Sequence, residues 1–128
     1  MGQRIVLVGH CGIDAPRLEQ AVSRCVPSAE VIAVNSEQRL EEVCDEGADL
    51  LLINRELPFG FDAEEGIELM RELKQIRPTV KLMLVSNRRD AQERASEAGG
   101  IEGFGKADIG SKKVSACLHD ALKKQKPN

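Results

Sequence analysis

The sequence predicts an α/β fold in which helices cover both faces of a parallel β-sheet. Short aliphatic runs alternate five times with segments whose apolar residues recur every three or four positions, the pattern of repeated strand and helix units. Four consecutive aliphatic residues, Leu50 to Ile53, predict a central strand that is buried on both faces. The 128 residues suffice for one such domain, which we expect over 1–128 with an ordered core over about 3–123.

The first half of the chain contains two strand–helix units and the central strand. The predicted strands are Arg4 to Val8, Glu30 to Val34 and Leu50 to Asn54. Asp14 is a suitable N-cap for the first helix, and Ser36 caps a second helix that Gly47 ends. The apolar stripes of these two helices are Leu18, Val22 and Val26, followed by Leu40, Val43 and Cys44.

The second half contains two further strand–helix units after a long loop. We expect the loop after Pro58 to expose Phe59 and Phe61. The inward stripe of the third helix is Ile67, Met70, Leu73 and Ile76. The remaining elements are a strand from Val80 to Val85, a polar helix from Asp90 to Ala98, a strand from Ile101 to Phe104 and a last helix that Ser111 caps.

Five strands joined by right-handed helical crossovers predict a flavodoxin-like three-layer sandwich with about five helices. Its strand order is expected to be 2-1-3-4-5, which places the ends of strands one and three side by side at the switch point. Ligands of open α/β sheets bind at this edge. Gly9, His10, Cys11 and Asn54 should therefore meet there.

Composition excludes several classes of partner. The formal net charge is −3 and both signs of charge are interspersed, which argues against a dedicated surface for nucleic acid or anionic membrane. No apolar run approaches the roughly 20 residues of a membrane span, and the N-terminus lacks a signal-peptide pattern, so we expect a cytoplasmic protein. With three Phe and no Trp or Tyr, few rings are present to stack on a flavin, and we expect no cofactor.

Three landmarks, in this order, resemble those of response-regulator receiver domains. The run Ala-Asp-Leu-Leu-Leu-Ile-Asn-Arg-Glu-Leu-Pro over 48–58 is similar to the family's third strand. Ser86 ends strand four, where the family has Thr or Ser, and Lys106 ends strand five, where the family has a lysine. The resemblance covers nearly the whole chain and implies a role in two-component signalling. In that family an aspartate ending strand three accepts a phosphoryl group beside a Mg²⁺ held by an acidic pair after strand one.

The sequence departs from the family at the residues that perform this chemistry. Gly9 and His10 stand in place of the acidic pair, and Asn54 stands in place of the acceptor. Mg²⁺ prefers carboxylate oxygens, and an amide is no nucleophile, so no metal site and no acyl phosphate are expected. We therefore expect a non-enzymatic, phosphorylation-independent pseudo-receiver. Ser86 and Lys106 complete its degenerate pocket, with Lys106 hydrogen-bonded to Asn54 or to nearby carbonyls.

The resemblance also implies where such a domain meets its partner. Receiver domains mostly dock a signalling protein, or a second copy of themselves, through the region that corresponds to Arg88 to Lys124. Gly103 stands where the family has a switch aromatic, and Phe104 takes that place only if the register shifts by one residue.

A thiol enzyme is the alternative from another class. Cys11 and Arg17 form a Cys-x5-Arg spacing after strand one, which resembles the phosphate-binding loop of low-molecular-weight phosphatases and arsenate reductases. Pro16 removes a backbone donor from such a loop, and Asp14 places a negative charge where a phosphate would lie. The other cysteines, Cys25, Cys44 and Cys117, fall on apolar stripes and are expected to pack as small core residues.

Overall fold

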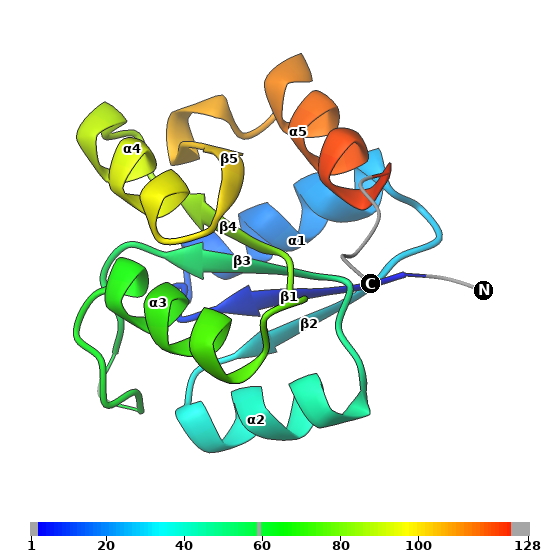
Figure 1. Ribbon diagram of the computed structural model, residues 1–128. Coiled ribbons are helices and arrows are strands. Elements are labelled where there is room, and N and C mark those ends of the chain that lie inside the picture. The colour runs from blue at the N-terminus through cyan, green and yellow to red at the C-terminus, as the bar shows by residue number, and fades with distance from the viewer. Residues whose placement is uncertain (1–2, 59, 124–128) are drawn as a thin grey trace.

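The structure, a computed structural model, describes residues 3–58 and 60–123, which form a parallel five-stranded sheet between two layers of helices (Figure 1). The strands are β1 (Arg4–Val8), β2 (Glu30–Val34), β3 (Leu50–Asn54), β4 (Leu82–Val85) and β5 (Ile101–Phe104). The helices are α1 (Asp14–Cys25), α2 (Glu37–Glu46), α3 (Gly66–Ile76), α4 (Arg89–Glu97), the 3-10 helix η1 (Lys106–Asp108) and α5 (Lys112–Lys123). The strand order β2-β1-β3-β4-β5 confirms the predicted flavodoxin-like topology.

Two apolar clusters divide the core between the faces of the sheet. Helices α2, α3 and α4 cover one face, where residues such as Leu40, Met70 and Ala95 pack on Val6 and Leu51. Helices α1 and α5 cover the other face (Figure 1). The central strand β3 contributes to both clusters, because alternate residues of a strand point to opposite faces. This explains its unbroken aliphatic run.

The strands are in regular register except at the β4–β5 pair. Met83 pairs with Ile101 and Val85 pairs with Phe104, so two steps along β4 correspond to three along β5. This irregularity has the form of a β-bulge, which bends the strand locally. The Phe104 ring packs in the α1–α5 layer, where the side chain is 1% exposed.

Several local predictions need correction. The helix α1 begins at Asp14, so its N-cap is Ile13, and no side chain caps it. The strand β4 begins two residues later than Val80. Phe61 was expected to be exposed but is buried in the α2–α4 layer, because the loop folds back over the end of β1. The prediction for Phe59 lies outside the described residues.

Ile76 is the other residue whose placement was predicted wrongly. Its spacing continues the stripe of Leu73, but the side chain is 73% exposed. It is the last residue of α3, where the helix has passed the apolar residues that cover its earlier turns. No helix within the described residues is long and apolar enough to cross a membrane.

Candidate functional site

A cleft of about 200 Å³ opens at the carboxyl ends of β3, β4 and β5. It is lined by Asn54, Arg55, Glu56, Val85, Ser86, Asn87, Arg88 and Lys106. Three of the five residues predicted for the degenerate pocket line it, namely Asn54, Ser86 and Lys106. Gly9 and His10 do not line it. They lie at the neighbouring end of β1, and Asn54 links the two places.

The amide of Asn54 is held by two carbonyl groups. Its Nδ2 donates to the carbonyl oxygen of Gly9 at 3.1 Å and to that of Glu56 at 2.8 Å. Both contacts need a donor, and a carboxylate at this position has none to offer. The residue that replaces the expected acceptor therefore ties the end of β3 to the end of β1. An aspartate would leave both carbonyls without these hydrogen bonds.

Gly9 fills a position that rejects a side chain. Its φ is +74°, in the left-handed region. A Cβ at this position would lie 2.8 Å from Leu57 Cδ2 and 3.2 Å from Pro58 Cδ. The first position of the expected acidic pair is therefore closed by backbone conformation and by the β3–α3 loop.

His10 is buried, with 5% of its surface exposed. Its Nε2 lies 2.9 Å from the carbonyl oxygen of Leu52. Because a carbonyl only accepts, Nε2 carries the proton, and the buried Nδ1 has no partner among the described residues. Burial lowers the pKa of His10, and the charge of Lys106 lowers it further, while Asp14 acts in the opposite direction. The second position of the acidic pair thus holds a neutral ring.

Lys106 is paired with a carboxylate that the sequence analysis did not assign to the pocket. Its Nζ lies 2.7 Å from Oδ2 of Asp14, at the start of α1. The expected hydrogen bond to Asn54 or to nearby carbonyls is not what the structure shows. The hydrogen bond from Lys106 holds the pKa of Asp14 below its ordinary value. The lysine therefore has a counter-ion without any phosphoryl group.

These residues do not fit a Mg²⁺ ion. The described residues contain no group of three or more His, Cys, Asp or Glu side chains placed to hold a metal. Gly9 offers no side chain, Nε2 of His10 is engaged with Leu52, and the Asp14 carboxylate is engaged with Lys106. Mg²⁺ requires oxygen ligands in near-octahedral arrangement. These side chains therefore do not provide the ligands of a Mg²⁺ site at this edge.

The loops after β4 and β5 are held together by side chains that the sequence analysis missed. Ser86 Oγ accepts the N–H of Arg88 at 3.1 Å, and Asn87 Oδ1 accepts the N–H of Ala107 at 2.9 Å. The backbone approaches so closely that a Cβ on Gly105 would lie 2.0 Å from Asn87 Oδ1. The Ser-Asn pair directly after a strand was the available signal, since both residues bond nearby backbone.

Gln92 of α4 occupies the bulge in β5. Its Nε2 approaches the carbonyl oxygens of Leu84, Ser86 and Phe104 at 2.9, 3.1 and 3.4 Å. A Cβ on Gly103 would lie 2.2 Å from the Leu84 carbonyl oxygen and 3.2 Å from Gln92 Oε1. Gly103, at the position where the family has a switch aromatic, therefore has no room for a side chain, and Gln92 packs against it. The contacts depend on the bulge, which the sequence signals only through Gly103.

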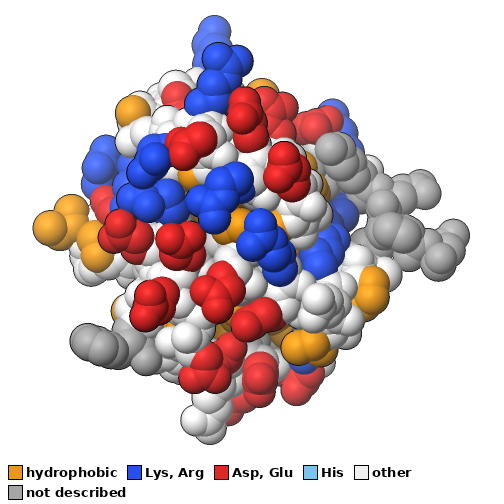
Figure 2. All heavy atoms as spheres, turned by 60° about the vertical axis from the view of Figure 1, so that its left-hand side comes forward, with side chains coloured by type: hydrophobic (Ala, Val, Ile, Leu, Met, Phe, Trp, Pro, Cys, Tyr) orange, Lys and Arg blue, Asp and Glu red, His pale blue; other side chains and the backbone are white. Residues whose placement is uncertain are grey.

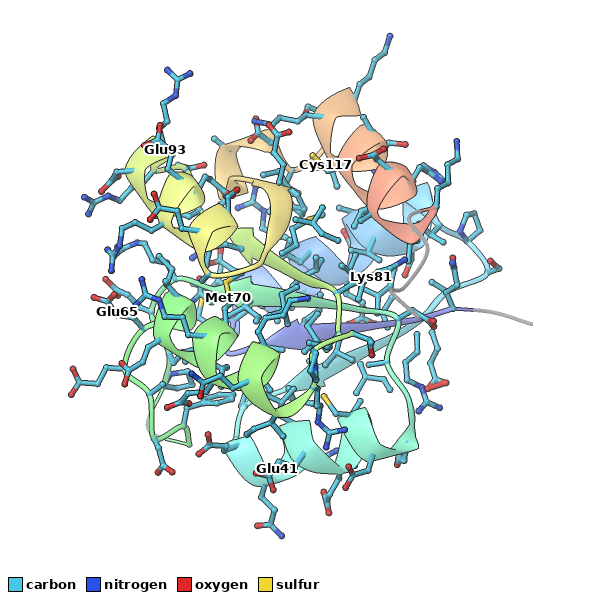
Figure 3. The ribbon with its side chains drawn as sticks, in the orientation of Figure 1. Glu41, Glu65, Met70, Lys81, Glu93 and Cys117 are labelled. Carbon is cyan, nitrogen blue, oxygen red and sulfur yellow. The ribbon has the colours of Figure 1, made fainter. Side chains whose placement is uncertain are left out.

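The geometry does not favour the thiol-enzyme alternative. Cys11 is exposed, and its Sγ accepts the N–H of Asp14 at 3.4 Å, while the N–H of Ala15 donates to the Cys11 carbonyl at 2.9 Å. These donors are already used, and Pro16 has none. Arg17 is exposed on α1. The other three cysteines are partly buried against the apolar clusters, and Cys117 Sγ lies 3.8 Å from the Gly103 carbonyl oxygen (Figure 3).

Comparison with known proteins places the fold. No protein-family model matches the chain, and no curated protein matches it in sequence. A putative response regulator from Chloroflexus aurantiacus superposes with a TM-score of 0.82 at 18% identity, covering 97% of this chain and 100% of that one. The signal receiver domain of a DNA-binding response regulator from Colwellia psychrerythraea gives 0.73 at 14% identity, covering 95% and 99%.

A third similar structure is a CheY-like response regulator receiver domain protein from Methanospirillum hungatei. Its TM-score is 0.70 at 21% identity, and the match covers 98% of this chain and 100% of that one. The similarity thus extends over the whole sheet and its helices, and the strand order is the same as the one described above. The chain has the fold of the response-regulator receiver domains.

Proposed function

We propose that this chain is a receiver-like signalling module that acts through protein–protein contacts and is not phosphorylated at the end of β3. The observation that carries the proposal is Asn54, whose amide replaces the acceptor and donates to Gly9 and Glu56. An amide nitrogen cannot form an acyl phosphate. The domain is not an enzyme in this proposal, and it uses no cofactor.

The remaining polar groups of the pocket support the same proposal. Lys106 has Asp14 as its counter-ion, and Ser86 Oγ accepts the Arg88 N–H. Both groups thus have partners within the protein, which supports signalling by binding rather than by modification of this pocket.

The face formed by α4, β5 and α5 is the proposed contact surface for a signalling partner or a second copy. A second cleft of about 540 Å³ lies there, and Arg89, Glu102 and Lys113 line it. Basic and acidic side chains are interspersed on the upper part of the face shown in Figure 2. The predicted surface, Arg88 to Lys124, ends at a residue outside those that the structure describes. We place the protein in the cytoplasm, which suits its four free cysteines.

Chemical phosphorylation tests the absence of an acceptor. The chain is incubated with Mg²⁺ and acetyl phosphate, or with beryllofluoride, beside a receiver domain that has the acidic pair and the aspartate. We expect an adduct by intact mass spectrometry only in the control domain. Asn54→Asp should add little, because Gly9 and His10 still provide no metal ligands. An acid-labile adduct that maps to the 200 Å³ cleft would overturn the proposal.

Charge reversal tests the contact face. Arg89 is the better probe, because Arg94 lies 3.7 Å from Glu65 within the molecule. Arg89→Glu should weaken self-association or partner binding about tenfold, as the loss of one interfacial hot spot does. Arg17→Glu, on the exposed side of α1, is the matched control. Equal sedimentation behaviour of the two variants would remove the α4–β5–α5 face from the proposal.

A further inference from the structure

A groove of about 290 Å³ runs between α2 and α3, on the sheet face opposite α1 and α5. Its apolar part is formed by Leu40 of α2 and by Leu69 and Leu73 of α3. Ile76 continues this part at the end of α3, where it is 73% exposed. Only Ile13 and Ile76 are large apolar side chains with high exposure among the described residues. Ile76 is therefore the apolar side chain of the groove that the domain leaves largely uncovered, since Leu40, Leu69 and Leu73 are 1%, 1% and 7% exposed.

The rim of the groove is acidic. Four carboxylates line it, from Glu37, Glu41, Asp45 and Glu72, against a single guanidinium, that of Arg77. Arg77 is bonded to Asp45 and its charge also acts on Glu41, so a single cation faces four carboxylates. Figure 2 shows acidic side chains gathered on the lower part of the visible face, over α3 and α2, and Figure 3 marks Glu41 on α2.

Acidic groups also crowd the end of the groove at the start of α2. Glu37 Oε2 accepts the N–H of Asp62 at 3.4 Å, which brings the carboxyl groups of these two residues together. Partial burial raises the pKa of Glu37, and the carboxyl groups of Asp62 and Glu72 raise it further. Like charges without counter-ions disfavour each other's ionisation, and an added cation would relieve this. The groove thus has an exposed apolar side chain, Ile76, beside carboxylates that a positively charged group would stabilise.

We infer that the α2–α3 groove binds an amphipathic helix of a partner protein that carries leucine-like side chains on one face and lysine or arginine beside them. An apolar anchor would cover Ile76 beside the buried leucines, and the flanking cations would pair with Glu37, Glu41 and Glu72. The inference rests on the proposed function, because it names one partner class for a module that acts by contact. It adds a second surface on another side of the fold from α5.

A designed peptide tests the inference directly. The probe is a synthetic helical peptide of about 18 residues, five turns long, with leucines on one face and lysines beside them. A second peptide has glutamate in place of every lysine. We expect the basic peptide to shift backbone amide signals of α2 and α3 in a ¹⁵N-labelled chain, and the acidic peptide to leave them unchanged. Shifts confined to other elements would overturn the inference.

Matched variants separate the groove from general electrostatics. Glu72→Lys and Ile76→Asp should each weaken binding of the basic peptide about tenfold. Their controls make the same changes elsewhere, with Glu19→Lys on α1 and Ile13→Asp before it. All four side chains are exposed, so folding should be retained, and thermal melting checks this. Equal weakening by test and control variants would overturn the inference.

Two further outcomes distinguish this inference from the proposed function. If the chain dimerises and Glu72→Lys abolishes the dimer, a second copy occupies the groove, and the basic partner helix is wrong. If the basic peptide binds the groove but the chain is phosphorylated at the cleft, the inference stands and phosphorylation independence falls. If the peptide does not bind and the chain is not phosphorylated, the inference about the groove is overturned and the proposed function stands.

Discussion

The carboxyl edge of the sheet has two corners whose polar groups find partners in different ways. At the β1–β3 corner, defined by Gly9, His10 and Asn54, the side chains of His10 and Asn54 bond to backbone carbonyls. At the β4–β5 corner, defined by Ser86, Gln92 and Lys106, the Ser86 hydroxyl accepts a backbone N–H and Lys106 pairs with the Asp14 carboxylate. The first corner is thus held by hydrogen bonds to the main chain, whereas the second also uses an ion pair with α1.

The difference shows two ways in which polar groups at the end of a sheet are satisfied within the protein. A buried polar group needs a partner, since an unsatisfied one costs about 1–3 kcal/mol. Asn54 and Lys106 both have such partners. His10 is the exception, because its buried Nδ1 is unpartnered among the described residues. The four predictions below perturb one corner or the other, from the largest expected effect to the smallest.

Gly9 at the β1–β3 corner should be the least replaceable residue of the edge. Gly9→Asp forces a side chain onto a left-handed backbone and against Leu57 and Pro58, so we expect a loss of about 3 kcal/mol in unfolding free energy. Gly12→Ala is the control, because a Cβ there meets nothing within 4 Å. Urea unfolding measures both. Similar stability of Gly9→Asp and the parent protein would show that this corner can still accept an acid.

This result bears on any attempt to restore phosphorylation. Replacing Gly9, His10 and Asn54 together by aspartate would introduce the three carboxylates of the receiver-family pattern. The first of these changes conflicts with the backbone, so the triple variant tests folding before it tests metal binding. An absence of Mg²⁺ binding by an unfolded triple variant would say nothing about the receiver fold.

At the β4–β5 corner, Gln92 should be required as a donor. Gln92→Glu keeps the shape but points a carboxylate at the carbonyls of Leu84, Ser86 and Phe104, so we expect a loss of about 2 kcal/mol at pH 7. Gln75→Glu, exposed on α3, is the control for the charge. Denaturant unfolding measures the free energy of unfolding of both variants. Equal stability of the two variants would mean that the bulge does not depend on this side chain.

The sequence predicted the sheet well because its signals are local. The bounds of β1, β2 and β5 match the prediction, β3 lies within the predicted run, and Ser36 caps α2 through its Oγ as expected. Aliphatic runs and capping residues act within a few positions, so they can be recognised without knowledge of the fold. The topology then followed from general rules of crossover connections.

The site was predicted only in part because its contacts join distant segments. Asn54, Ser86 and Lys106 line one cleft, since all three lie at the ends of strands of the same sheet. The Lys106–Asp14 pair spans almost the whole chain, and nothing local distinguishes Asp14 from a helix cap. The exposure of Ile76 likewise depends on where α3 ends relative to its neighbours.

His10 should make stability depend on pH in a window of its own. The pKa of His10 is lowered in the folded state, so below its ordinary value of about 6.5 the unfolded chain takes up the proton first. Stability should therefore fall as pH drops from about 6.5 toward the folded pKa, by up to about 1.4 kcal/mol per pH unit. His10→Gln should abolish this slope, whereas His119→Gln, at an exposed position on α5, should not. Urea unfolding between pH 7 and pH 5 provides the comparison, and a slope unaffected by His10→Gln contradicts the prediction.

The smallest effect should come from the Lys106–Asp14 pair, which connects the two corners. The side chains are 35% and 15% exposed, so a double-mutant cycle of Lys106→Met and Asp14→Asn should give a coupling energy of at most about 1 kcal/mol. The pKa of Asp14 is lowered, so this contribution is present above about pH 4 and is lost as pH falls through the folded pKa. The two single variants should also move the His10 titration in opposite directions. Lys106→Met removes a charge that lowers the His10 pKa and should raise it, while Asp14→Asn should lower it. NMR titration of His10 in the parent protein and the two variants measures these shifts, and shifts of the same sign would show that the two corners are not coupled through this pair.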